Sequence, residues 1–292
     1  MKFLDIIVNP TAGGKRGKRI KKALKAIEDR LNERQVQYKI HFTEEKNHGI
    51  KLTEQVIKQG ATNVVMVGGD GTLHEVINGF CDFERVNLGI IPCGTGNDFA
   101  SALGLPKNPV KALDLILDGE AKYTDYMQMP TVRGMNIICM GIDVLVLQKY
   151  QALKRKNKLG YTKCLVQALM NFEYTDFVAN IDGEEVAYRS FIACVANGNQ
   201  YGGGIPIAPP ANPTDNQLDF VAVKEIKKGK IPSAFLKLKA GKILTLPQGV
   251  HKPCTHVKVT PSKTSYVNVD GELYYDIPLE VQIVSNTLKV YR

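Results

Sequence analysis

Glycine-rich turns that directly follow short apolar runs constrain the fold of this chain more than any other feature of its sequence. The apolar run Asn63 to Val67 ends in GGDGT at residues 68 to 72, and Leu88 to Ile91 ends in PCGTGNDFA at residues 92 to 100. A third run, Phe3 to Val8, ends in NPTAGGKRGK. Such runs indicate buried strands, and ligands of open α/β sheets bind where adjacent strands end. The pattern therefore predicts an anion-binding edge on a mostly parallel sheet.

The GGDGT turn carries side chains that suit phosphate chemistry. Gly68 and Gly69 allow a positive φ and a close approach of the backbone to an anion. Asp70 can act on Mg²⁺ directly or through water, and Thr72 can donate a hydrogen bond to phosphate. A glycine-rich turn after a strand is often only a turn, so this motif alone leaves both interpretations open. The presence of the other loops favours the phosphate site.

The two other loops lead to different expectations. In the PCGTGNDFA loop, a helix that starts at Asn97 or Asp98 would direct its positive end at a bound phosphate. The first loop superficially resembles a P-loop, but the spacing from Gly13 to Lys18 is one residue short, and Arg19 stands where Ser or Thr is required. We therefore reject a P-loop of the Walker A type.

The pattern of the chain changes after Lys122, and its 292 residues exceed a typical single domain. Up to residue 123, apolar runs alternate with amphipathic segments, which predicts βαβ units and a mostly parallel sheet covered by helices. After it, short strands dominate and predict an antiparallel sandwich or barrel. We expect an α/β N-terminal domain followed by a mainly antiparallel β-sandwich C-terminal domain.

Periodicity also places individual elements. In the first domain, we expect a helix that buries Ile20, Leu24, Ile27 and Leu31, a strand at Tyr38 to Phe42, a helix through Leu52 to Lys58, and a helix from Asn108 and Pro109 that buries Val110, Leu113 and Leu117. In the second domain, we expect strands at Asp125 to Met129, Phe177 to Ile181, Arg189 to Ala196, Leu218 to Val223, Val257 to Thr260, Ser265 to Val269 and Leu279 to Val284, with helices at Tyr161 to Phe172 and Ile231 to Ala240.

The formal charge of +9 and the pI near 9.1 favour attraction to polyanions, such as a nucleotide, an anionic bilayer or nucleic acid. Basic residues cluster at Lys15 to Lys22, Lys154 to Lys158 and Lys224 to Lys230, although solvated helix faces and turns would explain such clusters equally well. No RNA-recognition signature or helix-turn-helix pattern accompanies them. Nucleic acid is therefore the weakest of the three partners.

Cysteine spacing and hydropathy indicate the cellular compartment. The six cysteines lie without CxxC spacing, so we expect reduced thiols, with neither a disulfide framework nor a zinc site. No segment approaches 18 uninterrupted apolar residues, and the start MKFLDIIVNP is too short for a signal peptide. We expect a soluble, cytoplasmic protein.

Further motifs follow the three loops in a fixed order. They are GID at Gly141 to Asp143, KLGY at Lys158 to Tyr161, NGNQYGGGIPIAPPA at Asn197 to Ala211 and NVDGE at Asn268 to Glu272. With NPTAGG, GGDGTLHEVINGF and GTGNDFA, they make the chain resemble, nearly end to end, the bacterial soluble diacylglycerol kinases, which are part of the lipid kinase and NAD kinase superfamily. The sequence departs from the family pattern at Ser101, where Arg is common, and at Asn216, where Gly is common.

The resemblance implies the domain organisation and the nucleotide site. Residues 1 to 123 would form the nucleotide-binding catalytic domain, to which residues 285 to 292 return, and residues 124 to 284 would form the lipid and metal-site domain. ATP would lie along Asn9, Pro10, Thr11, Ala12, Gly13, Thr43, Gly68, Gly69, Asp70, Gly71, Thr72, Glu75, Thr95, Gly96, Asn97 and Asp98. From the sequence alone, Thr43 would instead be a helix cap before Glu44.

The resemblance also implies which acidic residues act. Phosphoryl transfer is mainly positioning and charge neutralisation, with a carboxylate that accepts the proton of the acceptor hydroxyl. The family pattern makes Glu272 the base and Asp270 its supporting acid or metal partner, with Asp70 at the nucleotide. An ordinary Asp-Gly hairpin turn would explain the VDGE segment without any catalytic role.

A structural Mg²⁺ site is the last feature that the resemblance implies. It would use the side chain of Asp215 and the carbonyl groups near Asn212 and Gln217, in the oxygen-rich segment NPTDNQLDF. A solvated Asx turn is the alternative explanation. The absence of Gly at position 216 weakens the metal hypothesis.

The resemblance, together with the loop motifs, implies an ATP- and Mg²⁺-dependent lipid kinase that converts diacylglycerol to phosphatidic acid. It would be cytoplasmic, with peripheral contact to the inner face of the cell membrane. The alternatives are a kinase for another glycerolipid or a long-chain base, an NAD kinase, which shares GGDGT, and a non-catalytic nucleotide or lipid sensor. An exposed strand of the second domain could mediate a homodimer.

Overall fold

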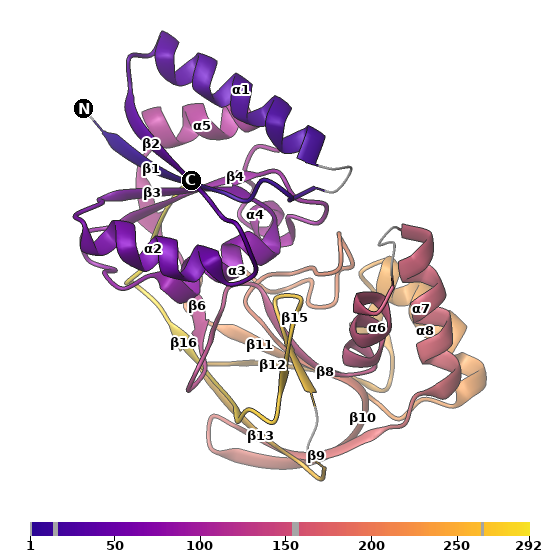
Figure 1. Cartoon of the computed structure of the whole chain (residues 1–292). Helices are drawn as coiled ribbons and strands as arrows, with labels where there is room; N and C mark the ends of the chain where they lie inside the picture. Colours follow the sequence, from indigo (N-terminus) through magenta and orange to yellow (C-terminus); the bar gives the residue numbers. More distant parts are fainter. Residues whose placement is uncertain (1, 14–16, 154–157, 264–265) are drawn as a thin grey trace. The chain divides into compact units, whose positions relative to one another are not determined.

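The computed structural model describes residues 2–13, 17–153, 158–263 and 266–292. The chain divides into two compact units, which we describe separately (Figure 1). Unit 1 comprises Met1–Tyr126, Pro213–Asp215 and Val284–Arg292, and unit 2 comprises Met127–Asn212 and Asn216–Ile283. Parts of three sequence features, namely residues 14–16 of the first loop and basic cluster, residues 154–157 of the second cluster, and Ser265 of an expected strand, lie outside the described residues.

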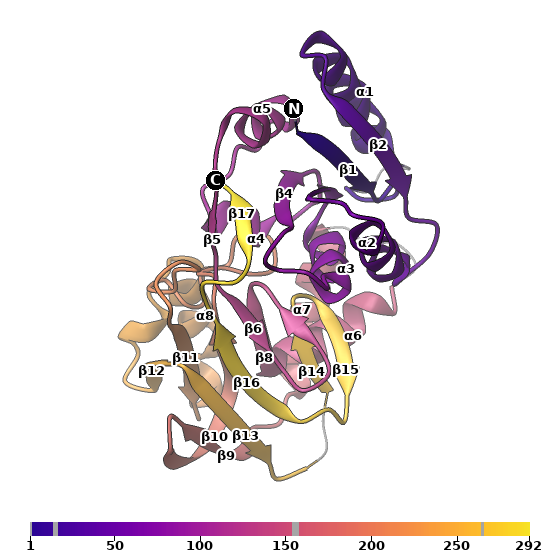
Figure 2. The same cartoon turned by 90° about the vertical axis from the view of Figure 1, so that its left-hand side faces the viewer.

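Unit 1 contains a six-stranded sheet in the order β2-β1-β3-β4-β17-β5. Its strands are β1 Phe3–Val8, β2 Gln37–Phe42, β3 Asn63–Gly68, β4 Asn87–Pro92, β5 Ala121–Tyr123 and β17 Lys289–Tyr291. All neighbours from β2 to β17 pair in parallel, and only the β17–β5 pair is antiparallel. The expected mostly parallel α/β unit is therefore confirmed, and the C-terminal strand is part of its sheet (Figure 2).

Helices cover both faces of this sheet. They are α1 Lys18–Glu33, α2 His48–Lys58, α3 Asp70–Gly79, α4 Asp98–Ala102 and α5 Pro109–Asp118. Because side chains alternate along a strand, Leu4, Ile6 and Val8 of β1 pack with α1 and α5 in one core. Helices α2 and α3 lie on the opposite face (Figure 1). Because both faces of this sheet are buried, the sequences of its central strands are continuous apolar runs.

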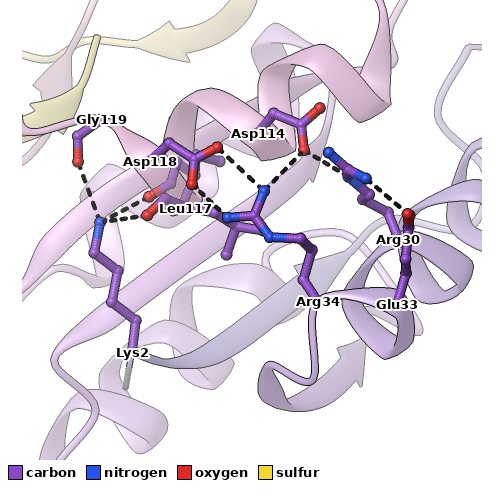
Figure 3. A network of polar contacts seen from close by, with 9 residues as sticks. Lys2, Arg30, Glu33, Arg34, Asp114, Leu117, Asp118 and Gly119 are labelled. Carbon is purple, nitrogen blue, oxygen red and sulfur yellow. Dashed lines mark hydrogen bonds and ion pairs between the residues drawn. The ribbon is translucent and has the colours of Figure 1, made fainter.

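A network of polar contacts connects α5 to α1 and to Lys2 (Figure 3). Arg30 Nε lies 2.7 Å from Asp114 Oδ1, and the Arg34 guanidinium contacts Asp118. The ammonium of Lys2 donates to three carbonyl oxygens at the end of α5, which satisfies groups that a helix end leaves without intrahelical partners. Lys2 directly precedes β1, whereas the glycine loops follow the strands, so this network stabilises the end of the unit away from those loops.

The expected helix faces are partly wrong. In α1, three of the four expected residues are buried, but Leu24 is only half-buried and Ala23 takes its place in the core. In α5, Leu113 is buried together with Ala112 and Ile116 instead of Val110 and Leu117. The buried face of α5 differs from the expected face because Gly89 of β4 leaves space for the Ile116 side chain. This side chain lies 2.8 Å from where a Cβ of Gly89 would be. Periodicity alone does not reveal this gap in the facing strand.

Unit 2 is built on an eleven-stranded sheet in the order β15-β14-β8-β10-β9-β13-β16-β6-β7, with β11 and β12 branching from β10. Its strands are β6 Tyr126–Gln128, β7 Arg133–Gly134, β8 Ile137–Gly141, β9 Thr175–Ile181, β10 Glu184–Ala196, β11 Leu218–Lys224, β12 Gly249–Cys254, β13 His256–Pro261, β14 Tyr266–Val269, β15 Glu272–Tyr275 and β16 Leu279–Val284. The long strand β10 pairs antiparallel with β8, β9 and β11. The expected β-rich second unit is confirmed.

Three helices pack beside this sheet, and they enclose a second apolar core (Figure 1). They are α6 Ile142–Gln151, α7 Lys158–Asn171 and α8 Ile231–Lys239, with short 3-10 turns at Lys228–Lys230 and Ile243–Thr245. The first core of unit 2 lies between strands and centres on residues such as Phe220 and Val257. Across the described chain, no helix has the length and apolar character needed to cross a bilayer.

Strands β7, β8 and β12 and helix α6 are absent from the sequence-based expectations. Residues 137 to 147 are apolar except for Gly141 and Asp143, so no period separates β8 from the start of α6. The strand ends at Gly141, which has a φ of +93°. Strand β12 contains Pro253 and polar residues, which argue against a central strand. Among the strands that the structure describes, β12 pairs with β11 alone, so a proline is tolerated at this edge.

Candidate functional site

The glycine loops that follow β3 and β4 touch through their backbones. The carbonyl oxygen of Gly68 accepts hydrogen bonds from the backbone N–H groups of Cys93, at 2.7 Å, and of Gly94, at 3.1 Å. A Cβ on Gly69 would lie 2.8 Å from the Cα of Gly94, which no side chain tolerates. A Cβ on Gly68 would lie 2.6 Å from the Cβ of Thr72. These glycines are required because the two loops pack without space for side chains.

Asp70 joins the same two loops through its carboxylate. Its Oδ2 accepts from the backbone N–H of Asn97 at 2.7 Å, and its Oδ1 accepts from that of Asp98 at 2.8 Å. The Asn97 side chain in turn bonds Gly94, accepting from its N–H at 2.8 Å and donating to its carbonyl at 3.1 Å. The first N–H groups of α4 therefore bind a protein carboxylate. Asp70 fixes the PCGTGNDFA loop in place as well as presenting negative charge there.

The loop that follows β1 meets these two. Gly13 has a φ of +75°, and a Cβ there would lie 2.6 Å from the carbonyl oxygen of Cys93. Arg19, at the start of α1, donates to the carbonyl oxygen of Gly94 at 3.0 Å. Asn9 organises the turn itself, since its Oδ1 accepts from both the backbone N–H and the hydroxyl of Thr11. All three glycine-rich loops thus converge at the carboxyl end of β1, β3 and β4.

Exposure distinguishes the residues of these loops. Thr11, Gly71 and Thr95 are exposed, whereas Thr72 and Asp98 are buried. The other residues expected to bind nucleotide in these loops are half-buried or buried, namely Asn9, Pro10, Ala12, Gly13, Gly68, Gly69, Asp70, Gly96 and Asn97. The structure therefore brings these loop residues to one edge of unit 1. The glycines among them allow phosphate oxygens to approach the backbone closely.

Thr43 lies on the segment that connects β2 to α2, and Glu75 of α3 contacts the end of that segment. Thr43 is buried, and its N–H donates to the carbonyl oxygen of Val8 at 2.9 Å. The helix cap interpretation of Thr43 is wrong, because α2 begins at His48 with Asn47 as its N-cap residue. The two oxygens of Glu75 accept from the N–H groups of Asn47, at 2.9 Å, and Gly49, at 2.8 Å. Glu75 therefore holds the start of α2.

Glu272 lies at the end of a two-residue hairpin loop in unit 2. Val269 and Glu272 are paired across β14 and β15, and the residues between them, Asp270 and Gly271, have φ of +53° and +94°. Positive φ at both central residues is the signature of a type I′ turn, which favours Asp-Gly. The hairpin expected from the sequence is therefore present. It presents the half-buried Glu272 as the first residue after the turn.

Asp270 has a different environment from Glu272. Its carboxylate accepts three backbone hydrogen bonds, from the N–H groups of Met135 at 2.6 Å, Asn136 at 2.9 Å and Ile137 at 3.0 Å. Its own N–H donates to the carbonyl oxygen of Ile137 at 3.1 Å. These contacts fasten the hairpin to the segment that precedes β8. In this structure Asp270 positions the turn that carries Glu272.

Asp143 is a buried carboxyl group that the sequence marked only through the GID motif. It lies at the start of α6, and Asn268 Nδ2 donates to its Oδ2 at 2.5 Å. Asn268 Oδ1 accepts from the N–H of Gly271 at 2.8 Å, so the chain of contacts reaches the hairpin loop. Burial raises the pKa of Asp143 to about 6, and the hydrogen bond from Asn268 opposes this shift. Asp143 is therefore a titratable group near neutral pH, one short network away from Glu272.

The segment expected to bind Mg²⁺ contains one residue with a left-handed backbone conformation. Asn216 has a φ of +63°, the left-handed conformation that glycine commonly supplies and asparagine tolerates. Asp215 belongs to unit 1, whereas Asn212 and Gln217 belong to unit 2. Among the residues that the structure describes, no group of three or more His, Cys, Asp or Glu side chains could hold a metal ion. A metal at Asp215 would therefore depend on carbonyl oxygens.

Comparisons with known proteins show the family of the chain. The model of the diacylglycerol kinase catalytic domain matches residues 4–129, and the model of the YegS C-terminal NAD kinase beta sandwich-like domain matches residues 136–292. A diacylglycerol kinase of Bacillus subtilis is 27% identical over 276 residues, covering 93% of this chain and 90% of that protein. One of Mycobacterium tuberculosis is 28% identical over 256 residues, covering 82% and 80%.

Solved structures show the same fold. A crystal structure of a diacylglycerol kinase from Bacillus anthracis superimposes with a TM-score of 0.78 at 23% identity, covering 99% of this chain and 96% of that one. The fold and the relatives define the class of protein as a lipid kinase. The chain belongs to the diacylglycerol kinase family, through both its catalytic domain and its C-terminal domain.

Proposed function

We propose that this protein transfers the γ-phosphate of ATP, with Mg²⁺, to the hydroxyl group of diacylglycerol and releases phosphatidic acid and ADP. The observation that carries the proposal is the convergence of three glycine-rich loops at one edge of the unit 1 sheet, where Asp70 binds the loop of Asn97 and Asp98. Names of relatives support diacylglycerol as the acceptor, since two of them are diacylglycerol kinases.

The nucleotide would lie along the loop edge of unit 1. The contact of Gly68 and Gly69 with Gly94 leaves backbone rather than side chains at this edge, so phosphate oxygens can approach closely. Exposed Thr95 would donate a hydroxyl hydrogen bond to a phosphate oxygen, whereas the Thr11 hydroxyl donates to Asn9. Thr43, which directly follows β2, would contact the nucleotide as well. Glu75 would act indirectly, because both its oxygens hold the start of α2.

Mg²⁺ suits the oxygen donors of these segments. Carboxylate and carbonyl oxygens are its usual protein ligands, and Asp70 supplies a carboxylate where the loops meet. When bound, the ion would neutralise negative charge on the phosphates during transfer. A second, structural Mg²⁺ would use Asp215 with carbonyl groups near Asn212 and Gln217, where the left-handed Asn216 preserves the turn.

Glu272 would act as the base. In the proposed step the Glu272 carboxylate accepts the proton of the acceptor hydroxyl, the hydroxyl oxygen bonds to the γ-phosphorus, and the bond from phosphorus to the bridging oxygen of ADP breaks. Asp270 would keep Glu272 in place through its three backbone hydrogen bonds.

Peripheral contact with the inner face of the cell membrane would deliver the acceptor. The net charge of +9 favours an anionic lipid surface. Phosphoryl transfer to any lipid hydroxyl follows the same chemistry, so another glycerolipid or a long-chain base is the second candidate acceptor. NAD kinase activity and a non-catalytic sensor are the remaining alternatives, and homodimer formation in solution is a separate proposal.

A label-transfer experiment distinguishes these functions. Purified protein is incubated with Mg²⁺, γ-labelled ATP and mixed micelles of a lipid panel that includes diacylglycerol, with NAD in a parallel reaction. We expect labelled phosphatidic acid. Label in another lipid would change the acceptor but keep the mechanism, label in NADP would make the protein an NAD kinase, and no label at all would favour the sensor.

A further inference from the structure

Arg19 lies in the first turn of α1, directly after the loop that follows β1. It stands at the position where a Walker A loop would have Ser or Thr, so that motif gives it no role. In the structure its Nη1 donates to the carbonyl oxygen of Gly94 at 3.0 Å. The Arg19 guanidinium therefore lies on the loop that follows β4, although the two residues are 75 positions apart in the chain.

The start of α1 packs closely on the loop that follows β1. A Cβ on Gly17, the N-cap residue of α1, would lie 2.4 Å from the carbonyl oxygen of Pro10. A Cβ on Gly13 would lie 3.2 Å from the Cδ of Arg19. Because both positions are glycine, the Arg19 side chain can pass over Gly13 and reach Gly94. It thus spans from the loop after β1 to the loop after β4.

The loops that follow β3 and β4 carry negative charge of their own. Residues 68–72 and 92–100 include Asp70 and Asp98, and they contain no lysine or arginine. The triphosphate of a nucleotide brings several more negative charges to the same edge, where like charges repel one another. Phosphoryl transfer depends on neutralising this charge, and Mg²⁺ at Asp70 would neutralise only part of it. A cationic side chain at this edge would therefore strengthen nucleotide binding.

The turn from Gly94 to Asn97 lies between two opposite charges. At one end, Asp70 Oδ2 accepts from the N–H of Asn97 at 2.7 Å. At the other end, the carbonyl oxygen of Gly94 accepts from Asn97 Nδ2 at 3.1 Å and from Arg19 at 3.0 Å. The exposed Thr95 and the half-buried Gly96 lie between these ends. A phosphate chain on this turn would have the metal-binding carboxylate on one side and the guanidinium on the other.

Arg19 retains the capacity to bind an anion in addition to Gly94. Its side chain is exposed, and a guanidinium presents several N–H donors in a planar fork, which matches the geometry of phosphate oxygens. The positive end of the α1 dipole lies at the same place. Burial raises the pKa of the Cys93 thiol to about 11, and the charge of Arg19 opposes this shift, so that charge acts at the end of β4.

We propose that Arg19 binds the phosphate chain of the nucleotide, with its guanidinium held beside Thr95 by the carbonyl oxygen of Gly94. This assignment rests on the nucleotide part of the proposed function and adds a cationic residue to it. Arg19 is thus a determinant of affinity for the triphosphate, and it belongs to the part of the chain whose spacing excludes a Walker A loop.

Calorimetric titration with ATP and Mg²⁺, in the absence of lipid, tests this assignment without any kinase reaction. We expect Arg19→Ala to raise the Kd for ATP at least about tenfold at about 0.1 M salt, because a charge-assisted bond to phosphate is lost. The difference from the wild type should narrow at about 1 M salt, where the screening length falls to about 3 Å. Arg19→Lys keeps the charge without the planar fork, so its Kd at low salt should lie between the two.

Lys25→Ala is the matched control. Lys25 is an exposed cation of the same helix, six residues and about 9 Å further from the loops, and its loss should change the Kd less than about twofold. Equal affinity of Arg19→Ala and the wild type, or equal weakening in Lys25→Ala, would overturn the proposal. A loss in Arg19→Ala that is the same at both salt concentrations would also overturn it, because Arg19 would then act only by holding Gly94.

The titration separates this inference from the proposed lipid kinase function. If the wild type binds ATP but phosphorylates no lipid, the affinities of the variants still decide the role of Arg19, and only the acceptor is wrong. If the wild type binds no ATP, the proposed function fails and the assignment of Arg19 fails with it.

Discussion

Glu272 and Asp270 lie two residues apart on one hairpin, yet their contacts predict opposite consequences of mutation. Glu272→Gln should lower turnover at least about 100-fold, the usual contribution of a general base, with little change in melting temperature. Asp270→Ala should instead lower the free energy of unfolding by about 3 kcal/mol or more, because three backbone N–H groups lose a charged acceptor. Turnover and thermal melting of both variants check this contrast. Normal turnover in folded Glu272→Gln would remove that residue from the mechanism.

Asp143 makes the stability of the protein depend on pH. Burial raises its folded pKa to about 6, above the ordinary value of 3.8. A raised carboxyl pKa contributes stability below the unfolded pKa, and this contribution is lost as the pH rises through the folded pKa. The shift of about 2 units corresponds to roughly 3 kcal/mol between about pH 4 and pH 7.

The variant Asp143→Asn removes this titration but keeps an oxygen that can accept from Asn268. We therefore expect its free energy of unfolding, relative to the wild type, to increase between about pH 4 and pH 7 by up to roughly 3 kcal/mol. Urea denaturation across this range, followed by circular dichroism, measures the difference. Parallel pH profiles for the two proteins would show that the Asp143 carboxyl does not titrate in this window.

At the level of elements, the contact between the β3 and β4 loops predicts the effect of adding one methyl group. A Cβ at Gly94 would collide with the Cα of Gly69, so Gly94→Ala must push the two loops apart. We expect KM for ATP to rise at least about tenfold, because phosphate positioning depends on both loops. Gly229→Ala is the control, since a Cβ there meets nothing within 4 Å. Unchanged ATP kinetics in Gly94→Ala would separate these loops from nucleotide binding.

The elements that could be predicted from the sequence are those with local signals. Strands β1, β3 and β4 are short apolar runs closed by glycine, and α5 begins at Pro109 after Asn108, whose side chain accepts from two N–H groups of the helix. By contrast, β8 and the first half of α6 form one largely apolar run in which no period marks the boundary at Gly141. The local sequence predicts the boundary of an element where a turn residue such as glycine follows it. It does not predict the boundary where both elements are buried on all sides, because the hydrophobic periodicity is then lost.

The candidate site was predictable as a set of loops but not as a set of contacts. Asp70 bonds residues 27 and 28 positions away, and Asp270 bonds residues more than 130 positions away, so neither partnership leaves a trace in local spacing. Asp143 is similar, because its contact with Asn268 spans 125 positions. The sequence indicated which side chains carry chemistry, whereas the structure shows which of them also hold the loops together.

At the scale of the whole molecule, a net charge of +9 predicts binding to anionic lipid surfaces. Sedimentation with vesicles rich in anionic lipid should exceed that with purely zwitterionic vesicles, and should weaken as salt rises from about 0.1 M to about 1 M, because the screening length falls from about 10 Å to about 3 Å. Equal binding to both vesicle types would show that charge does not direct the protein to the membrane.

The central claim is that the loop edge organised by Asp70 transfers phosphate to a lipid hydroxyl. It is tested most directly by following label from γ-labelled ATP into diacylglycerol micelles with the wild type and with Asp70→Ala, after circular dichroism has shown that the variant is folded. We predict labelled phosphatidic acid from the wild type and at least about 100-fold less from Asp70→Ala. Label in NADP instead of lipid, or equal phosphatidic acid from both proteins, would contradict it.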